Sequence, residues 1–157
     1  MASALLWLAL ATARALDSAS PAAVPAHAIT EIALERNCFG CPNGSLLVLQ
    51  RNGTATSTVI GSARLGTVNR VSTGRVRRED FDALAQLLVS RGFFALEDEY
   101  ADPRLRDGEW TSIRAVRDGR EKKVFDRAHA GPARLQAIEA AIDAVKAGLG
   151  LTPSSVP

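Results

Sequence analysis

Residues 45–60 read Ser-Leu-Leu-Val-Leu-Gln-Arg-Asn-Gly-Thr-Ala-Thr-Ser-Thr-Val-Ile, which is two strand-like runs separated by a turn. The continuous apolar run over residues 46–49 predicts a buried strand, and residues 54–60 are rich in Thr and Val, which favour strands. Asn52-Gly53 between them is typical of a type I′ turn, whose two central residues both need a positive φ. The stretch therefore predicts an antiparallel hairpin.

Further strand-like segments lie on both sides of this hairpin. Residues 29–36 alternate loosely, with Ile32 and Leu34 on one face, as in a half-buried strand. Asp118-Gly119 separates two later strand-like runs and predicts a second hairpin. Strands are thus predicted over residues 29–36, 45–50, 54–60, 65–76, 110–117 and 120–126.

Two segments have helical periodicity instead. Residues 78–91 place apolar side chains at helical spacing, with acids in the first turn and Gly92 as a stop. Phe93 and Phe94 follow and are expected to close the core beneath this helix. Residues 132–147, which begin with a proline, predict a second helix. Because no strand–helix–strand repeat recurs, the sequence predicts an α+β fold: an antiparallel or mixed sheet of about five to six strands with two helices on one face.

Composition limits the class of protein. The chain has 157 residues, enough for one ordinary domain, and its 46% hydrophobic and 23% charged residues are typical of a globular protein. The net charge of +2 is unlike the concentrated basic excess of a dedicated nucleic-acid binder, so we expect no nucleic-acid partner. Two cysteines and two histidines leave little material for a zinc site, and we expect no metal and no cofactor.

The first residues predict export. Residues 2–13 are uninterruptedly apolar, but as a helix they reach only about 18 Å, too short to span a bilayer. The run fits the apolar region of a secretory signal peptide, although no Lys or Arg precedes it. We expect residues 1–28 to be a signal peptide and Ala/Pro linker, residues 29–149 one domain, and residues 150–157 a polar tail. The expected location is extracytoplasmic, periplasmic or secreted, with no transmembrane helix.

Cys38 and Cys41 form the most informative pair, in the sequence Cys-Phe-Gly-Cys-Pro. In an exported chain the default is a structural disulfide, which here fixes the turn between the first two strands. A redox-active dithiol is an alternative, although such motifs place the first Cys at a helix N-terminus, and here strands flank the pair. A metal site needs two further ligands, and only His27 and His129 offer nitrogen donors. We favour the structural disulfide.

The same stretch resembles the hallmark of a family of small bacterial domains of unknown function that carry a Cys-Phe-Gly-x-Cys-Pro motif. The resemblance extends from Ile29 to Val145, with one departure: the residue between Gly40 and Cys41 is missing, which shortens the turn. The resemblance implies a fold and an exported, often membrane-associated setting, and it implies no activity. Further matches are residues 46–53 and Gly92, Phe93, Phe94, Leu96, Asp98, Glu99, Tyr100, Asp107, Pro132, Leu135, Ile138, Glu139, Ile142 and Asp143.

Charged residues form two further candidate sites. An acidic cluster over residues 97–109 offers oxygen ligands for calcium but lacks the spacing of an EF-hand, so a solvated loop is favoured. Five arginines over residues 64–78 could meet phosphate or an anionic membrane surface, but a solvated edge strand is favoured. The acids are Glu97, Asp98, Glu99, Asp102, Asp107 and Glu109, and the arginines are Arg64, Arg70, Arg75, Arg77 and Arg78.

His129 is the candidate for acid–base catalysis. A catalytic His needs an orienting carboxylate and a nucleophile, and Asp126 and Ser112 are candidates only by their proximity in sequence. No nucleophile elbow, phosphate loop or zinc-protease motif occurs. Asn43 and Asn52 begin formal glycosylation sequons, but both are followed by Gly and are more simply explained as turns.

Together these features predict a non-enzymatic, exported domain that binds a protein or ligand at the cell envelope. Cys38 and Cys41 are expected to be bridged, and Trp110 is expected in the core. The sheet face that the helices leave uncovered is the expected contact surface. The alternative function is a thiol-disulfide redox protein that uses Cys38 and Cys41, and a hydrolase that uses His129 is a third hypothesis.

Overall fold

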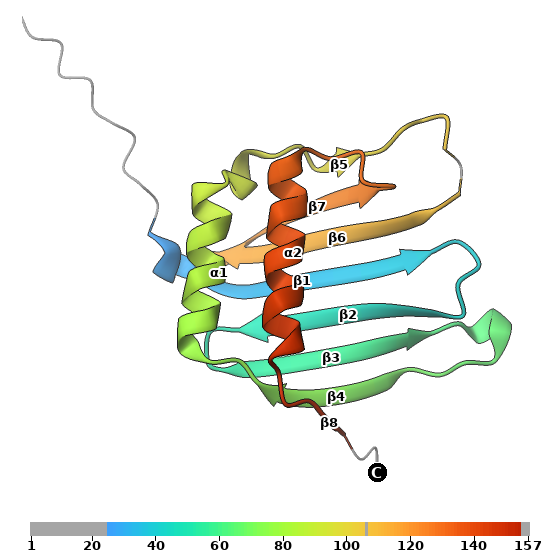
Figure 1. Ribbon diagram of the computed structural model, residues 1–157, viewed down its shortest axis with the longest axis horizontal. Coiled ribbons are helices and arrows are strands. Elements are labelled where there is room, and N and C mark those ends of the chain that lie inside the picture. Colours follow the sequence, from blue (N-terminus) through green and yellow to red (C-terminus); the bar gives the residue numbers. More distant parts are fainter. Residues whose placement is uncertain (1–24, 106, 155–157) are drawn as a thin grey trace, which may run out of the picture.

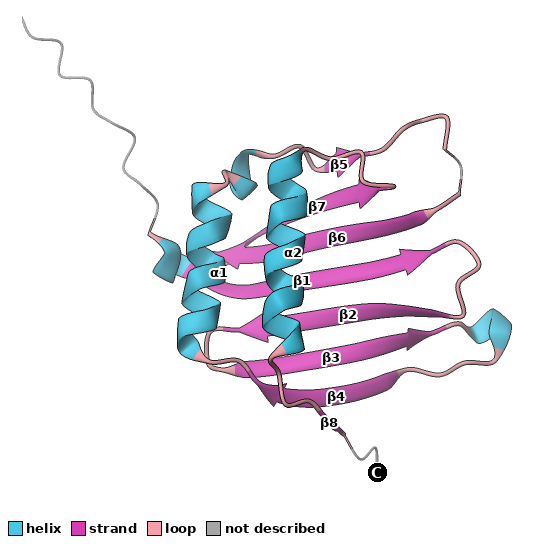
Figure 2. Cartoon of the chain, in the orientation of Figure 1, coloured by secondary structure: helices cyan, strands magenta, loops and turns pink. Residues whose placement is uncertain are grey.

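The computed structural model describes residues 25–105 and 107–154. Figure 1 shows a single sheet with both helices lying across the same face, and Figure 2 shows the same two layers by secondary structure. The long strands are β1 (Ile29–Cys38), β2 (Asn43–Gln50), β3 (Thr54–Gly61), β4 (Arg70–Arg75), β6 (Glu109–Arg117) and β7 (Arg120–Arg127). The helices are α1 (Arg78–Ser90) and α2 (Ala133–Ala147), with short 3₁₀ turns η1 (Ala26–Ala28), η2 (Ala63–Leu65) and η3 (Phe93–Ala95). The α+β class predicted from the sequence is confirmed.

Within the described residues the sheet has eight strands, in the order β5-β7-β6-β1-β2-β3-β4-β8, so the predicted number of five to six is wrong. The two additional strands are β5 (Glu99–Tyr100), parallel to β7, and β8 (Thr152–Pro153), antiparallel to β4. Each lies at one edge of the sheet and has two residues, too few to produce an alternating pattern. The sequence therefore predicts a charged loop and a polar tail at these positions.

Both predicted hairpins form, but the first has a different turn. The Gly53 N–H donates to the Gln50 carbonyl oxygen at 3.0 Å, and Gly53 has a φ of 91° whereas the φ of Asn52 is not positive. This is a three-residue connection with glycine in the positive-φ position, not a type I′ turn. In the second hairpin Asp118 and Gly119 have φ values of 51° and 72°, as the two-residue turn requires.

The connection between β3 and β4 is longer than the sequence suggests. The predicted strand over residues 65–76 is reduced to β4, because Leu65 closes η2 and Gly66 adopts a φ of 70°. The connection folds back over the end of β3 so closely that a Cβ on Gly61 would lie 2.4 Å from the Thr67 carbonyl oxygen. Glycine at position 61 is therefore required for this close approach.

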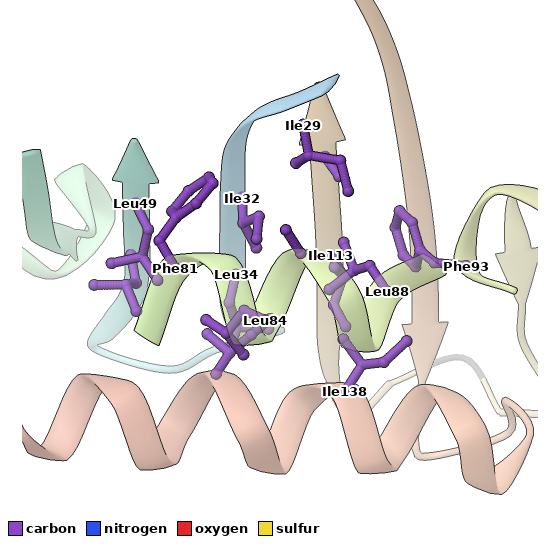
Figure 3. Close-up of a cluster of buried hydrophobic side chains, with 14 of the residues drawn as sticks. Ile29, Ile32, Leu34, Leu49, Phe81, Leu84, Leu88, Phe93, Ile113 and Ile138 are labelled. Carbon is purple, nitrogen blue, oxygen red and sulfur yellow. The ribbon is translucent and has the colours of Figure 1, made fainter. Parts of the chain in front are cut away.

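The core lies between the sheet and the two helices, and Figure 3 shows its central cluster. Both helices bury the apolar stripes that the sequence predicts, and Phe93 is fully buried beneath α1 as expected. The helices and the turn after α1 contribute Phe81, Leu84, Leu88, Phe93, Leu135, Ile138 and Ile142, and the strands contribute Ile29, Ile32, Leu34, Leu47, Leu49, Ile113 and Val124.

The structure of the N-terminal residues can be compared with the predicted signal peptide and linker. The predicted signal peptide falls mainly on residues 1–24, outside the described residues. Ala26–Ala28, placed in the linker by the sequence, form η1, and the Arg51 guanidinium donates to the Ala26 carbonyl oxygen at 2.9 Å. Among the described residues, no helix is long and apolar enough to cross a membrane. The boundaries after residues 28 and 149 stay predictions.

Candidate functional site

Three connections meet at one end of the sheet, at the right in Figure 1. They are the β1–β2 turn (residues 39–42), the β3–β4 connection (residues 62–69) and the β5–β6 connection, of which residues 101–105 and 107–108 are described. We call this end of the molecule the loop end. It contains the cysteine pair that the sequence singles out.

The Cys38–Cys41 disulfide closes the β1–β2 turn. Cys38 is the last residue of β1, Cys41 comes shortly before β2, and their Cα atoms are 5.4 Å apart. The structure thus contains the bridge that the sequence favours. In the described part of the chain no helix begins at either cysteine, so no helix dipole stabilises a thiolate here.

Hydrogen bonds hold the neighbouring connections in place. The Thr67 hydroxyl donates to the Pro42 carbonyl oxygen at 2.8 Å, which joins the β3–β4 connection to the disulfide turn. The Arg127 guanidinium donates to the Leu105 carbonyl oxygen at 3.3 Å, which joins the β5–β6 connection to β7. The three connections therefore present a defined surface around the disulfide.

Three depressions surround the disulfide turn. The largest, of about 400 Å³, is lined by both cysteines together with Arg36, Trp110 and His129. Another, of about 250 Å³, lies between the turn and the β3–β4 connection, and a third, of about 290 Å³, lies between the turn and the β5–β6 connection. All three are open to solvent, unlike the enclosed pockets in which proteins bury small molecules.

Arg36, two residues before the disulfide, fastens β1 to α2. Its guanidinium donates to both carboxylate oxygens of Asp143, at 2.7 and 2.8 Å, and these bonds hold the pKa of Arg36 above its ordinary value. It also lies 3.6 Å from the Glu139 carboxylate, which is buried and accepts a hydrogen bond from the Thr111 hydroxyl at 2.5 Å. This network fixes the end of β1, and with it the disulfide turn, against the helix layer.

The catalytic constellation considered for His129 does not assemble. Because the Thr111 hydroxyl bonds to α2, Thr111 faces the helices, and its cross-strand partner Asp126 faces the same way. Ser112 is the next residue of β6 and therefore points to the opposite face. The His129 side chain is more than half exposed and lies 3.8 Å from the Glu109 carboxylate, so it has neither the predicted orienting acid nor the predicted nucleophile.

Trp110 lies on the sheet face that the helices leave uncovered, not in the core that the sequence predicts for it. It is half-buried, and its ring centroid is 5.5 Å from that of Phe125. The same face carries Arg114, which pairs with Glu31 and, at 3.2 Å, with Glu121. The charge of Arg114 on this face is therefore already compensated within the protein.

Two residues of the acidic cluster, Asp98 and Asp102, are paired with nearby bases. Arg104 makes a bidentate pair with Asp102, with a closest distance of 2.7 Å, and these hydrogen bonds lower the pKa of Asp102. Lys122 pairs with Asp98. Within the described residues, no three metal-ligating side chains come close enough together to hold an ion. The solvated-loop interpretation fits these contacts better than a calcium site.

The five arginines over residues 64–78 separate into two groups. Arg77 and Arg78 pair with Asp80 and Asp82 in the first turns of α1, at 2.8 and 3.6 Å. The others have no carboxylate of a described residue within ion-pair distance, and they are Arg64, Arg70 and Arg75. The basic stretch is therefore only partly neutralised.

The expectation that both formal glycosylation sequons begin in turns is correct for Asn52 and wrong for Asn43, which lies in a strand. Asn43 is the first residue of β2, directly after the disulfide turn. The Asn52 side-chain oxygen accepts a hydrogen bond from the Thr54 N–H at 2.9 Å and so stabilises the first hairpin. Local turn geometry therefore accounts for Asn52 only.

Sequence reasoning missed four exposed apolar side chains. Each comes from one of the three connections, so all four lie at the loop end. The available signal was an apolar residue inside a turn or loop, which is weak because single exposed apolar residues are common. Their exposed fractions are 74% for Phe39, 47% for Leu65, 75% for Val68 and 43% for Leu105.

Comparisons with known proteins do not identify a family. A scan against protein-family models, a search of curated proteins and a search of solved structures each found no match. The resemblance to the domains with the Cys-Phe-Gly-x-Cys-Pro motif therefore stays a prediction.

Proposed function

We propose that this protein is an exported, non-enzymatic binding module that contacts a component of the cell envelope through its loop end. The proposal depends on one observation: Phe39, Leu65, Val68 and Leu105 are exposed together at that end, although they are far apart in the sequence. Large apolar side chains that gather on a surface mark sites of interaction. Loops held by a rigid scaffold are also where binding residues concentrate.

The extracytoplasmic location is supported by two independent features. The Cys38–Cys41 disulfide is of the kind that persists in oxidising compartments. Residues 2–13 have the composition of a signal-peptide apolar region. A binding module in this location agrees with the resemblance, which implies an exported setting and no activity.

The loop end is a better contact surface than the uncovered sheet face favoured by the sequence. On that face Arg114 is engaged by Glu31 and Glu121, so a partner would have to compete with internal ion pairs. At the loop end, by contrast, the four apolar side chains are exposed, and Phe39 and Leu65 line open depressions. Covering them removes apolar surface from water, which favours association.

The alternative is a redox function of Cys38 and Cys41. The reduction potential of the pair distinguishes a redox-active disulfide from a structural one. We expect a value below about −300 mV, typical of structural disulfides, because the pair lies between two strands and no helix N-terminus stabilises a thiolate. The measurement is equilibration of the purified protein with thiol redox buffers. A potential between about −120 and −270 mV would instead support the redox function.

Contact through the loop end is testable by photo-crosslinking in cells that produce the full chain. We expect a photoreactive amino acid in place of Phe39 or Leu65 to form adducts, detected by electrophoresis and identified by mass spectrometry. The matched control is the same amino acid in place of Ala140, which is exposed on α2. Adducts that are absent from both loop positions, or as abundant at Ala140, would contradict the proposal.

A further inference from the structure

One side of the loop end combines exposed apolar side chains with positive charge. Phe39, Arg64 and Leu65 line the same depression, of about 250 Å³, between the disulfide turn and the β3–β4 connection. Val68 and Arg70 follow on the same connection and at the start of β4, and both are exposed. We call these five residues the basic tip.

The positive charge of the basic tip is not compensated locally. No Asp or Glu occurs between Glu35 and Glu79, so β2, β3, β4 and their connections contain no acidic residue. Neither Arg64 nor Arg70 has an ion-pair partner among the described side chains. The tip therefore has the charge that complements an anionic partner.

The apolar side chains of the tip are strongly exposed. Phe39 and Val68 are about three-quarters exposed, at 74% and 75%, and come from different connections. A protein partner would have to be complementary in shape to these side chains to bury them. The boundary between lipid headgroups and acyl chains is fluid, so it accommodates them without pockets, while arginine heads remain among the headgroups.

We infer that the basic tip docks on the surface of an anionic lipid bilayer. Phe39, Leu65 and Val68 enter the headgroup boundary, and Arg64 and Arg70 contact lipid phosphates. This inference rests on the proposed function and names the partner of the loop end. The disulfide turn and the hydrogen bond from Thr67 to Pro42 hold the tip together before it meets the membrane, so little ordering is needed on binding.

Vesicle binding by the full chain tests the charge requirement. We expect the chain to bind vesicles of phosphatidylcholine mixed with phosphatidylglycerol and to bind vesicles of phosphatidylcholine alone only weakly. At high salt the affinities for the two kinds of vesicle should become equal, because salt screens the charges. Each arginine near such a surface contributes about fivefold in affinity, so Arg64→Gln with Arg70→Gln should weaken binding about 25-fold. The control is Arg120→Gln, an exposed arginine in the β6–β7 hairpin at the opposite end of the sheet.

Insertion is tested by fluorescence. A tryptophan placed by Val68→Trp should be quenched by lipids with brominated acyl chains, whereas one placed by Arg120→Trp should not. All variants keep residues 2–13, so binding by that apolar run is common to them and cannot produce a difference between positions. Equal affinity of the double arginine variant and the unchanged chain, or no extra quenching at position 68, would overturn the inference.

The outcomes separate this inference from the proposed function. Protein adducts at Phe39 without preference for anionic vesicles would leave the proposed function standing and show that the partner is a protein. The absence of both adducts and vesicle binding would overturn both proposals. Lipid adducts at Phe39 together with quenching at position 68 would support both.

Discussion

Replacing Phe93 with alanine is expected to lower the free energy of unfolding by about 3–5 kcal/mol. The Phe93 ring is fully buried in the central cluster of Figure 3, beneath the end of α1, and packs edge-on against Phe94 at 5.5 Å. Truncation removes the whole ring from the core and leaves a cavity that the sheet and two helices cannot close. Urea denaturation followed by circular dichroism measures the loss, with an unchanged dependence on urea concentration showing that the fold is intact.

The matched control is Phe94→Ala, the same substitution one residue further on. Phe94 is half-buried, and the Arg117 guanidinium lies 3.8 Å from its ring centroid. Its removal loses less buried area than the removal of Phe93, together with one half-buried cation–π contact, for an expected cost of about 1–2 kcal/mol. An equal loss for the two variants would contradict the assignment of Phe93 to the core and Phe94 to its border.

The elements that bury apolar side chains could be predicted from the sequence, because burial imposes a period on them. Phe81, Leu84 and Leu88 recur at helical spacing and all lie in the core, and Ile32 and Leu34 share the buried face of β1. The same physical requirement positions these residues in the sequence and in space. This is why the α+β class is correct.

Very short edge strands could not be predicted in this way. β5 and β8 add two residues each to the edges of the sheet, and neither buries a repeating side-chain pattern. The turn at Asn52-Gly53 shows a related limit. Glycine with positive φ fits both a two-residue and a three-residue hairpin loop, so the dipeptide predicts the hairpin but not its register.

The candidate site was only partly predictable, because most of it is assembled by topology. The turn that contains Cys38 and Cys41 is continuous in sequence, and its bridge follows from the spacing and the expected compartment. Phe39, Val68 and Leu105 lie at the same end of the molecule only because the connections that contain them lie at one end of the sheet. No local pattern encodes that arrangement.

Replacing Arg36 with methionine is expected to cost about 2–4 kcal/mol of stability, because the change leaves a buried carboxylate without its cation. Glu139 is 5% exposed and would keep only the hydrogen bond from Thr111. The Arg36 side chain is 33% exposed, so the expected loss lies toward the low end for a buried ion pair. Asp143, the other partner, is 45% exposed and is solvated when Arg36 is removed. Methionine preserves most of the apolar stem, so the loss reports the charge.

The control for this prediction is the double variant with Glu139→Gln, which replaces the buried carboxylate by a neutral amide of similar size. If the charge of Glu139 is what makes Arg36 necessary, Arg36→Met should cost less in the Glu139→Gln chain than alone, by about 1 kcal/mol or more. An identical cost in both backgrounds would show that Asp143 alone accounts for the contribution of Arg36.

Hydrogen exchange adds a test of where the structure loosens, because the contacts of Arg36 with Glu139 and Asp143 hold the end of β1 against α2. Amide protection should fall near Cys38, beside the disulfide turn, and stay unchanged in the first hairpin.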